Sequence, residues 1–359
     1  MLECMENEKN DRIRHAPFLD RLRTAEQAAG LIHPGDTVAM SGFTGAGYPK
    51  AVPGALAERI ERAHAQGIAF QVRVLTGAST APELDGVLAR ANGIELRLPY
   101  QSDPVVREQI NRGEVDYLDI HLSHVAQHAW FGYFGKIDVA VVEVTAVLED
   151  GRLVPSSSVG NNKTWLEQAD RVILEVNRWQ PAALEGMHDI YQGTALPPDR
   201  KPIPLLRPDD RIGEPYLRVD PAKVVAVVET EAPDRNSPFA PPDADSRAIA
   251  AHLLEFLDHE VRRGRLTPQL LPLQSGVGNI ANAVLAGLAE GGYRGLTAFT
   301  EVIQDGMLAL LRDGVLRMAS ATSFSLSPEG IAEFNRRVDF YRERIVLRPQ
   351  EMSNHPELI

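Results

Sequence analysis

The segment that most constrains the fold is IDVAVVEVTAV (137–147), in which apolar and β-branched residues follow one another almost without interruption. A strand with one face in water alternates apolar and polar residues, whereas a continuous apolar run is typical of a strand covered on both faces. Shorter apolar runs end in glycine turns at 37–42 and 70–77, and a helical pattern follows the first of them. The alternation of strand, glycine turn and helix predicts an α/β fold with a largely parallel sheet.

The chain has 359 residues, more than one hydrophobic core usually holds, so we expect two domains. Between about 190 and 222 the sequence becomes rich in proline and charge and loses its periodicity, as domain boundaries commonly do. The pattern then restarts with an apolar strand at 223–231, and residues 269–292 resemble a strand, a glycine turn and a helix. We therefore predict two related α/β domains, residues 1–215 and 216–359.

Composition excludes several classes of protein. With 44% hydrophobic and 24% charged residues, the chain has the composition of an ordinary globular protein. The formal net charge of −12 argues against a nucleic-acid partner, because binding phosphate requires clustered lysine and arginine. Cys4 is the single cysteine, so no intramolecular disulfide can form. The N-terminal stretch MLECMENEKNDRIR lacks the apolar region of a signal peptide, and no apolar run approaches the length of a membrane span. We expect a cytoplasmic protein that binds neither nucleic acid nor membrane.

Two glycine-rich segments, SGFTGAG (41–47) and SGVGN (275–279), each lie between a predicted strand and a predicted helix. Glycines there let a ligand approach the backbone, and the first N–H groups of the helix can bind negative charge. Small residues leave room for substrate, so we expect three of them to line a carboxylate or acyl pocket: Gly45, Ala46 and Gly47. The alternative is that the glycines only make tight turns.

The second segment also fits G-x-G-x-x-A, the pattern of dinucleotide-binding turns. Pro272 and two glutamines precede it, and it lies in the second half of the chain rather than in an opening βαβ unit. A nicotinamide or flavin site therefore remains a minor alternative.

Glu301 directly follows the apolar run LTAFT (296–300). In a parallel sheet the carboxyl ends of neighbouring strands share one edge, so Glu301 and the turn at 276–279 should face the same crevice. A carboxylate beside free backbone N–H groups can attack an acyl carbonyl while those groups hold the resulting oxyanion. The sequence thus indicates acyl-transfer chemistry, with a solvated carboxylate at a strand end as the alternative.

Two further groups of residues have the composition of possible sites. His121, His124 and His128 could share a helix face, but no carboxylate accompanies them in a ligand pattern, and we predict no metal site. Ser156, Ser157 and Ser158 lack the surroundings of a serine nucleophile, so we expect a turn that hydrogen-bonds its own backbone.

Seven segments, in this order, resemble the acetyl-CoA hydrolase/transferase family, which includes the succinyl-CoA:acetate CoA-transferases. They are SGFTGAGYPKAVP, VVEVTAV, VPSSSVGN, SGVGNIANAVLAGL, FTEVIQD, ATSFSLSPEG and LRPQEMSNHPE. The resemblance implies two related CoA-transferase-type domains with the active site between them, and a homodimer. It also implies acyl-CoA and a small carboxylate as substrates, and no metal or other cofactor.

The resemblance assigns roles to residues of this chain. Glu301 would take the acyl group from a CoA thioester as a mixed anhydride and then hold CoA as a glutamyl thioester. The N–H of Val277 would donate to the oxyanion, and Asn354 would contact the thioester region. The rest of the turn would bind substrate: Gly276, Gly278 and Asn279. Independently of the resemblance, we expect Arg235, on a proline-stiffened loop, to contact a CoA phosphate, because a guanidinium can bind phosphate through two hydrogen bonds. A solvated arginine is the alternative.

Members of that family continue well beyond SNHPE, whereas this sequence stops at Ile359. We therefore expect the second domain to be incomplete, whether the chain is a shortened protein, a natural fragment or half of a split enzyme. The alternatives to CoA transfer are hydrolysis of acetyl-CoA and a non-catalytic CoA-binding fragment. The sequence does not specify which acyl group or carboxylate is used.

Overall fold

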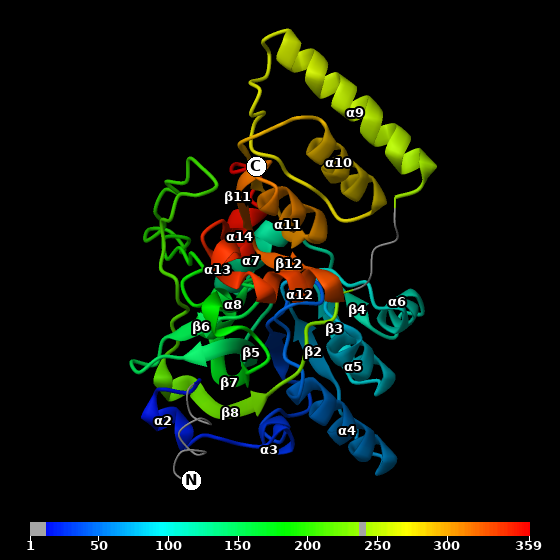
Figure 1. Ribbon diagram of the computed structural model, residues 1–359. Helices are drawn as coiled ribbons and strands as arrows, with labels where there is room; N and C mark the ends of the chain where they lie inside the picture. The colour runs from blue at the N-terminus through cyan, green and yellow to red at the C-terminus, as the bar shows by residue number, and fades with distance from the viewer. Residues whose placement is uncertain (1–11, 237–241) are drawn as a thin grey trace.

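The computed structural model describes residues 12–236 and 242–359, which form two α/β units (Figure 1). The first unit is built on an eight-stranded sheet of order β4-β3-β2-β1-β5-β7-β8, with β6 paired antiparallel to β5 and every other pair parallel. Its strands are β1 (Thr37–Met40), β2 (Val72–Leu75), β3 (Ile94–Leu98), β4 (Asp116–Tyr117), β5 (Ile137–Val147), β6 (Leu153–Pro155), β7 (Ala169–Asn177) and β8 (Val224–Thr230).

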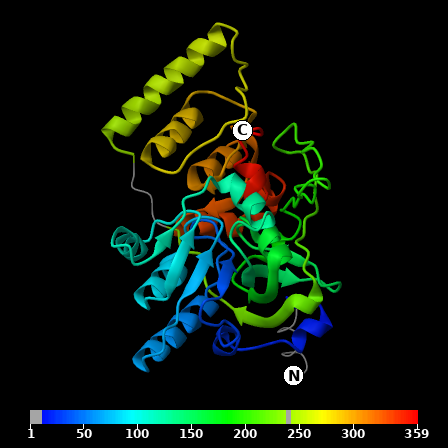
Figure 2. The same cartoon turned by 180° about the vertical axis from the view of Figure 1, so that it is seen from behind.

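Both faces of this sheet are buried, as the continuous apolar runs predicted. Alternate residues of β5 enter two different cores, with Val139 and Val141 on one face and Ala140 and Val142 on the other. Figure 2 shows the strands from behind with helices packed against them. The helices of this unit are α2 (Ala16–Leu19), α3 (Ala25–Ala29), α4 (Val52–Ala65), α5 (Val87–Arg90), α6 (Pro104–Asn111), α7 (Val125–Trp130) and α8 (Asn162–Gln168). The predicted α/β fold with a largely parallel sheet is confirmed.

The second unit contains two smaller parallel sheets. β13 (Ile345–Leu347), β11 (Leu316–Ala321) and β9 (Leu296–Phe299) form one, while β10 (Val302–Gln304) pairs with β12 (Ser323–Ser325) in the other. Its helices are α9 (Ala244–Arg262), α10 (Asn279–Glu290), α11 (Asp305–Arg312), α12 (Pro328–Arg336), α13 (Val338–Arg342) and α14 (Gln350–Ser353). In Figure 1 this unit occupies the upper part of the view, with α9 packed on α10 at its outer edge.

Two strands differ from the sequence interpretation. β8 was placed in the second domain, but it pairs with β7 from Val172↔Val224 to Asn177↔Thr230 and so belongs to the first sheet. We therefore propose a domain boundary after Thr230 instead of at residue 215. The predicted strand at 269–275 is reduced to a single bridge from Leu273 to Ala298, because Pro272 has no N–H to donate to a ladder.

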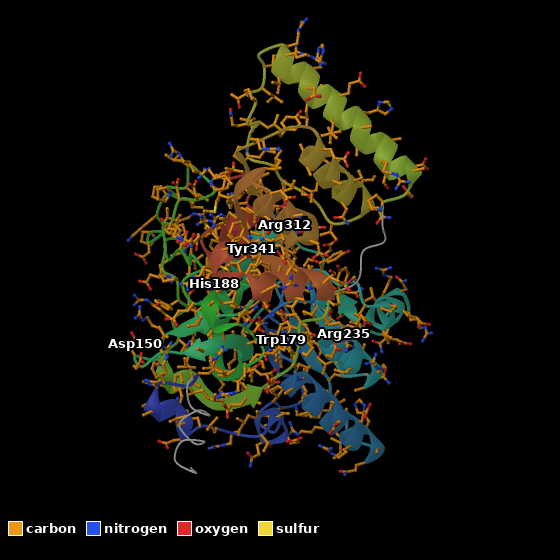
Figure 3. The ribbon with its side chains drawn as sticks, viewed as in Figure 1. Asp150, Trp179, His188, Arg235, Arg312 and Tyr341 are labelled. Carbon is orange, nitrogen blue, oxygen red and sulfur yellow. The ribbon has the colours of Figure 1, made fainter. Side chains whose placement is uncertain are left out.

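The two units are joined by backbone hydrogen bonds. The N–H of Val159 donates to Thr322 O at 2.9 Å, and that of Phe324 donates to Ser157 O at 3.1 Å. In Figure 3, Arg235 lies close to the level where these units meet. Within residues 12–236 and 242–359, no helix combines the length and apolar character needed to cross a bilayer. Cys4 lies outside the described residues.

Candidate active site

Glu301 lies between the end of β9 and the start of β10, where the chain passes from one small sheet to the other. Its carbonyl accepts a hydrogen bond from the N–H of Thr322 at 2.9 Å, which fixes the backbone. The hydroxyl group of Thr300, the residue before Glu301, makes two hydrogen bonds with the backbone of Ser275. It donates to Ser275 O at 2.9 Å and accepts from Ser275 N at 3.2 Å. The carboxylate and the glycine turn after Ser275 are therefore held at the same edge, as predicted.

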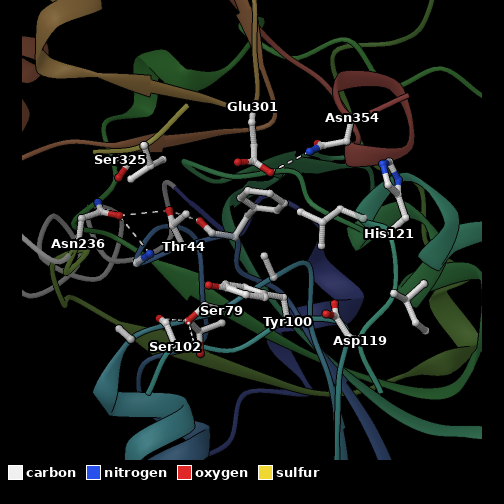
Figure 4. Close-up of a pocket in the computed structure, with 18 of the residues that line it drawn as sticks. Thr44, Ser79, Tyr100, Ser102, Asp119, His121, Asn236, Glu301, Ser325 and Asn354 are labelled. Carbon is white, nitrogen blue, oxygen red and sulfur yellow. Dashed lines mark hydrogen bonds between the residues drawn. The ribbon is translucent and has the colours of Figure 1, made fainter. Parts of the chain in front are cut away.

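The carboxylate points into a cavity of about 690 Å³ between the two units (Figure 4). Glu301 and Asn354 approach it from one side, and Ser79, Ser102 and Tyr100 lie across from them. Other residues that line it include Thr44, Gly45, Asp119, His121, Arg235, Asn236, Val277 and Ser325. The cavity is large enough to hold a drug-sized ligand, and both units contribute to its wall.

Two opposing effects act on the Glu301 carboxyl group. Burial raises its pKa, and a hydrogen bond from Asn354 Nδ2 to Oε1, 2.8 Å long, works in the lowering direction without cancelling the rise. Within the described residues, Oε2 has no hydrogen-bond partner. The result is a partly buried carboxylate with one oxygen held and the other free toward the cavity.

The glycine turn places one residue, Val277, in the cavity wall, and this residue is 51% exposed. The carbonyl of Gly276 accepts from Gln304 Nε2 at 2.7 Å, which ties the turn to β10. Gly278 has φ +134°, a conformation that favours glycine, and it caps the start of α10 at Asn279. Gly276, Gly278 and Asn279 are not among the cavity-lining residues of the described chain.

The opposite wall depends on a close backbone approach at Gly45. Its N–H donates to Asn236 Oδ1 at 3.0 Å, and its carbonyl accepts from Arg235 N at 2.9 Å. A Cβ at position 45 would lie 1.9 Å from Arg235 O, so only glycine fits. Ala46 is fully buried and Gly47 N donates to Asp234 Oδ1. Among the described residues, Gly45 contributes to the cavity wall, whereas Ala46 and Gly47 are not part of its lining.

Arg235 lines the cavity but is not free. Its guanidinium forms an ion pair with Glu83 at 2.6 Å, and its side chain is 66% exposed. An exposed ion pair of this kind contributes little to stability.

Sequence reasoning missed a buried charge cluster behind the Gly45 turn. Lys50 Nζ lies 2.6 Å from Glu143 and 2.9 Å from Asp234, and all three side chains are at most 5% exposed. Burial works to lower the pKa of Lys50, but the two carboxylates outweigh it and the net change is upward. Burial raises the pKa of Glu143 to about 7. Only the apolar surroundings of Lys50 and Glu143 in the sequence could have indicated such a cluster.

The serine segment belongs to this cluster. Ser156 Oγ donates to Glu143, Ser157 Oγ donates to Asp234, and Ser158 Oγ donates to Ala46 O at 3.0 Å. The expectation of a turn that bonds only its own backbone is therefore wrong. Asp234 is held in place because it also accepts from the N–H of Gly47, and the loop that follows it carries Arg235 and Asn236 to the cavity.

The three histidines lie beside one another. The rings of His121 and His124 are 5.0 Å apart between centroids, and those of His124 and His128 are 6.2 Å apart. Burial lowers the pKa of His124, and the neighbouring histidines lower it further. In the part of the chain described, no group of three or more histidine, cysteine or acidic residues is arranged to hold a metal ion.

Comparison with known proteins agrees with this geometry. Residues 5–229 match the model of the acetyl-CoA hydrolase/transferase N-terminal domain. The chain is 45% identical to the succinyl-CoA:acetate CoA-transferase of Clostridium kluyveri, covering 97% of this chain and 64% of that protein. It is 43% identical to the acetyl-CoA hydrolase of Schizosaccharomyces pombe, covering 98% of this chain and 68% of that protein.

Solved structures show the same fold. RipA from Yersinia pestis superposes with a TM-score of 0.69 at 21% identity, over 96% of this chain and 71% of that one. A 4-hydroxybutyrate CoA-transferase from Porphyromonas gingivalis superposes with a TM-score of 0.60 at 19% identity, over 95% of this chain and 70% of that one. The chain thus spans about two thirds of the length of its relatives, and it belongs to the acetyl-CoA hydrolase/transferase family.

Proposed function

We propose that this chain carries the nucleophile of an acyl-CoA:carboxylate CoA-transferase, with Glu301 as the attacking group. The observation that carries the proposal is the Glu301 carboxylate, partly buried in a cavity between two units, with one oxygen bonded to Asn354 and the other facing the cavity. Such a carboxylate is positioned for nucleophilic catalysis.

In the proposed reaction, two covalent intermediates form in turn on Glu301. A Glu301 oxygen attacks the thioester carbonyl carbon, the C–S bond breaks, and CoA thiolate leaves behind an acyl–glutamyl anhydride. The thiolate then attacks the glutamyl carbonyl and releases the acyl group as a carboxylate, so that CoA is held as a glutamyl thioester. An incoming carboxylate reverses both steps and leaves as a new acyl-CoA. Each tetrahedral intermediate carries an oxyanion, for which the N–H of Val277 is the proposed donor.

Two further residues support substrate binding in this proposal. Asn354 orients the carboxylate through the 2.8 Å hydrogen bond and so leaves one defined oxygen for attack. Arg235 binds a CoA phosphate after exchanging its ion pair with Glu83, because a guanidinium can bind phosphate through two hydrogen bonds. By the same family relation we propose a homodimer, with acetyl-CoA or succinyl-CoA and their carboxylates as the substrate class.

Hydrolysis is the second candidate, because the relative from Schizosaccharomyces pombe is named an acetyl-CoA hydrolase. Transfer and hydrolysis differ in whether a carboxylate or water attacks the enzyme-bound intermediate. For transfer, loss of acetyl-CoA would depend strongly on added succinate, because transfer of CoA to acetate only regenerates acetyl-CoA. For hydrolysis, the loss would not depend on an added acid.

The test of the proposal is a covalent adduct. The protein is incubated with acetyl-CoA, reduced with borohydride, digested and analysed by mass spectrometry for modification of the Glu301 peptide. We expect reduction of Glu301 to the alcohol in the native protein and in the exposed control Glu61→Gln, and none in Glu301→Gln. Tight CoA binding without any adduct would overturn the proposal and leave a CoA-binding module.

A further inference from the structure

Gln350 joins the helix that leads to Asn354 to the first unit. It is the first residue of α14, and its side chain is fully buried. Its backbone N–H donates to Gly160 O at 3.0 Å, and its side-chain Nε2 donates to Leu122 O at 2.7 Å. Its own carbonyl accepts the N–H of Asn354 at 2.9 Å. One residue thus ties two segments of the first unit to the residue that holds Glu301.

The side-chain amide of Gln350 is also enclosed by glycines. A Cβ at Gly77 would lie 2.9 Å from Oε1, and a Cβ at Gly160 would lie 3.6 Å from it. Gly77 is itself anchored by its N–H to Gly42 O at 3.1 Å. The segments around this amide each contribute to the cavity wall, through Ala78, Ser79, His121, Leu122 and Asn354.

We propose that Gln350 is a positioning residue that holds Asn354 against Glu301, a role that rests on the proposed function of Glu301. The helix α14 has only four residues, and a single turn is not stable by itself. Its direction is therefore set by external contacts, among them the partly buried 2.7 Å hydrogen bond from Gln350 Nε2 to Leu122 O. When that contact is lost, Asn354 is free to turn away from the carboxylate.

The effect is measurable without any substrate. The hydrogen bond from Asn354 is the contact that opposes the rise in the pKa of Glu301 caused by burial. Loss of Gln350 should therefore move the titration of Glu301 to higher pH, as loss of Asn354 should. A buried glutamine that serves only to stabilise the fold would leave this titration unchanged.

Gln109 provides the matched control. It lies in α6 and is buried, and its Nε2 donates to Ala89 O at 2.9 Å and to Asn92 Oδ1 at 3.0 Å. Neither Gln109 nor these two partners line the cavity. Gln350→Met and Gln109→Met each remove one buried amide and keep a side chain of similar length. Gln350→Asn keeps the amide but is too short to reach Leu122 O, and it serves as a second variant should Gln350→Met not fold.

The experiment follows the Glu301 carboxyl band by isotope-edited infrared spectroscopy across pH, with the band assigned by its loss in Glu301→Gln. We expect a shift to higher pH in Gln350→Met, Gln350→Asn and Asn354→Ala. The double variant Gln350→Met/Asn354→Ala should shift no further than Asn354→Ala, and Gln109→Met should not shift. An unshifted titration in the folded Gln350 variants, or an additive shift in the double variant, would overturn the proposal.

The proposed function is tested separately in the same samples. With acetyl-CoA at pH 6, adduct formation at Glu301 should be about tenfold slower in Gln350→Met than in Gln109→Met, since a hydrogen bond to a charged group has roughly that effect. If the native protein forms no adduct while the titrations behave as expected, the positioning role stands and the enzymatic proposal fails. Equal adduct rates in the two variants would contradict the positioning role instead.

Discussion

Two carboxylates of this protein, Glu143 in the first unit and Glu301 in the second, are both removed from water to a large extent but differ in the partners that hold them. Glu143 is fully buried, and four side chains hold it: Lys50, Ser156, Asn177 and Gln180. Glu301 is partly buried, and within the described residues its carboxylate has one hydrogen bond, from Asn354. Burial raises the pKa of both carboxyl groups.

The difference lies in what remains free for reaction. Every donor that Glu143 gains lowers the energy of its charged form and occupies a lone pair, so the group is held as part of the fold. Glu301 keeps one oxygen toward a cavity that both units line. A carboxylate can react when one of its oxygens has no hydrogen-bond partner and faces a cavity. Four substitutions test this contrast.

The largest effect is expected when Lys50, the cation that pairs with Glu143 and Asp234, is removed. Lys50→Met should lower the free energy of unfolding by about 3–5 kcal/mol, because Glu143 and Asp234 would be left as buried carboxylates without a cation. Urea denaturation measures this loss. Lys136→Met is the control, since Lys136 is 65% exposed beside Asp138 and Asp170 and should cost less than about 1 kcal/mol. Equal losses would show that the buried cluster is not structural.

The second effect concerns the single partner of Glu301. Asn354→Ala should slow formation of the Glu301 adduct by about 10- to 100-fold near neutral pH, the range expected for a hydrogen bond to a charged group. The pH profile should also move upward, because the lost hydrogen bond favoured the ionised carboxylate. Rates of adduct formation between pH 5 and 9 measure both changes. The exposed Asn111→Ala serves as control, and an unchanged profile in Asn354→Ala would contradict the assignment.

A smaller effect on stability is expected when Gly45, in the cavity wall opposite Glu301, is replaced by alanine. Gly45→Ala should destabilise the fold by about 1–3 kcal/mol, because the new Cβ would overlap Arg235 O and push the loop that carries Asn236. It should also weaken CoA binding, measured by calorimetry. Gly54→Ala is the matched control, since a Cβ there meets nothing within 4 Å in α4 and should stabilise that helix by up to about 1 kcal/mol. If Gly45→Ala binds CoA normally, this wall is not part of the site.

The smallest expected effect is the change in protein stability when Glu301 is replaced by glutamine. Burial raises its pKa above the unfolded value, so the folded protein binds the proton more tightly, and the stability this gives is lost as pH rises through the folded pKa. Glu301→Gln should therefore be more stable than the native protein at pH 8, with a difference that disappears near pH 4. Thermal unfolding at the two pH values measures it. A native protein as stable as the variant at pH 8 would mean that the carboxylate is not desolvated.

The sequence predicted the parallel sheet because a doubly covered strand has to be apolar on both sides, and 137–147 is. It also predicted that Glu301 and the turn at 276–279 would share an edge, because strand ends in a parallel sheet are adjacent. It did not predict that β8 joins the first sheet, since an apolar strand fits either unit equally well. Nor did it predict the Lys50 cluster, whose members are brought together from separate strands and loops by the fold alone.

The placement of Glu301 and Asn354 on different parts of the chain has a consequence for folding. The acid follows β9, whereas its amide partner follows a helix anchored to Gly160 and Leu122 of the other unit. A newly synthesised chain in which the two units have not yet docked would carry the acid without its orienting neighbour. The hydrogen bond from Asn354 that orients the Glu301 carboxylate therefore forms only once the two units have docked.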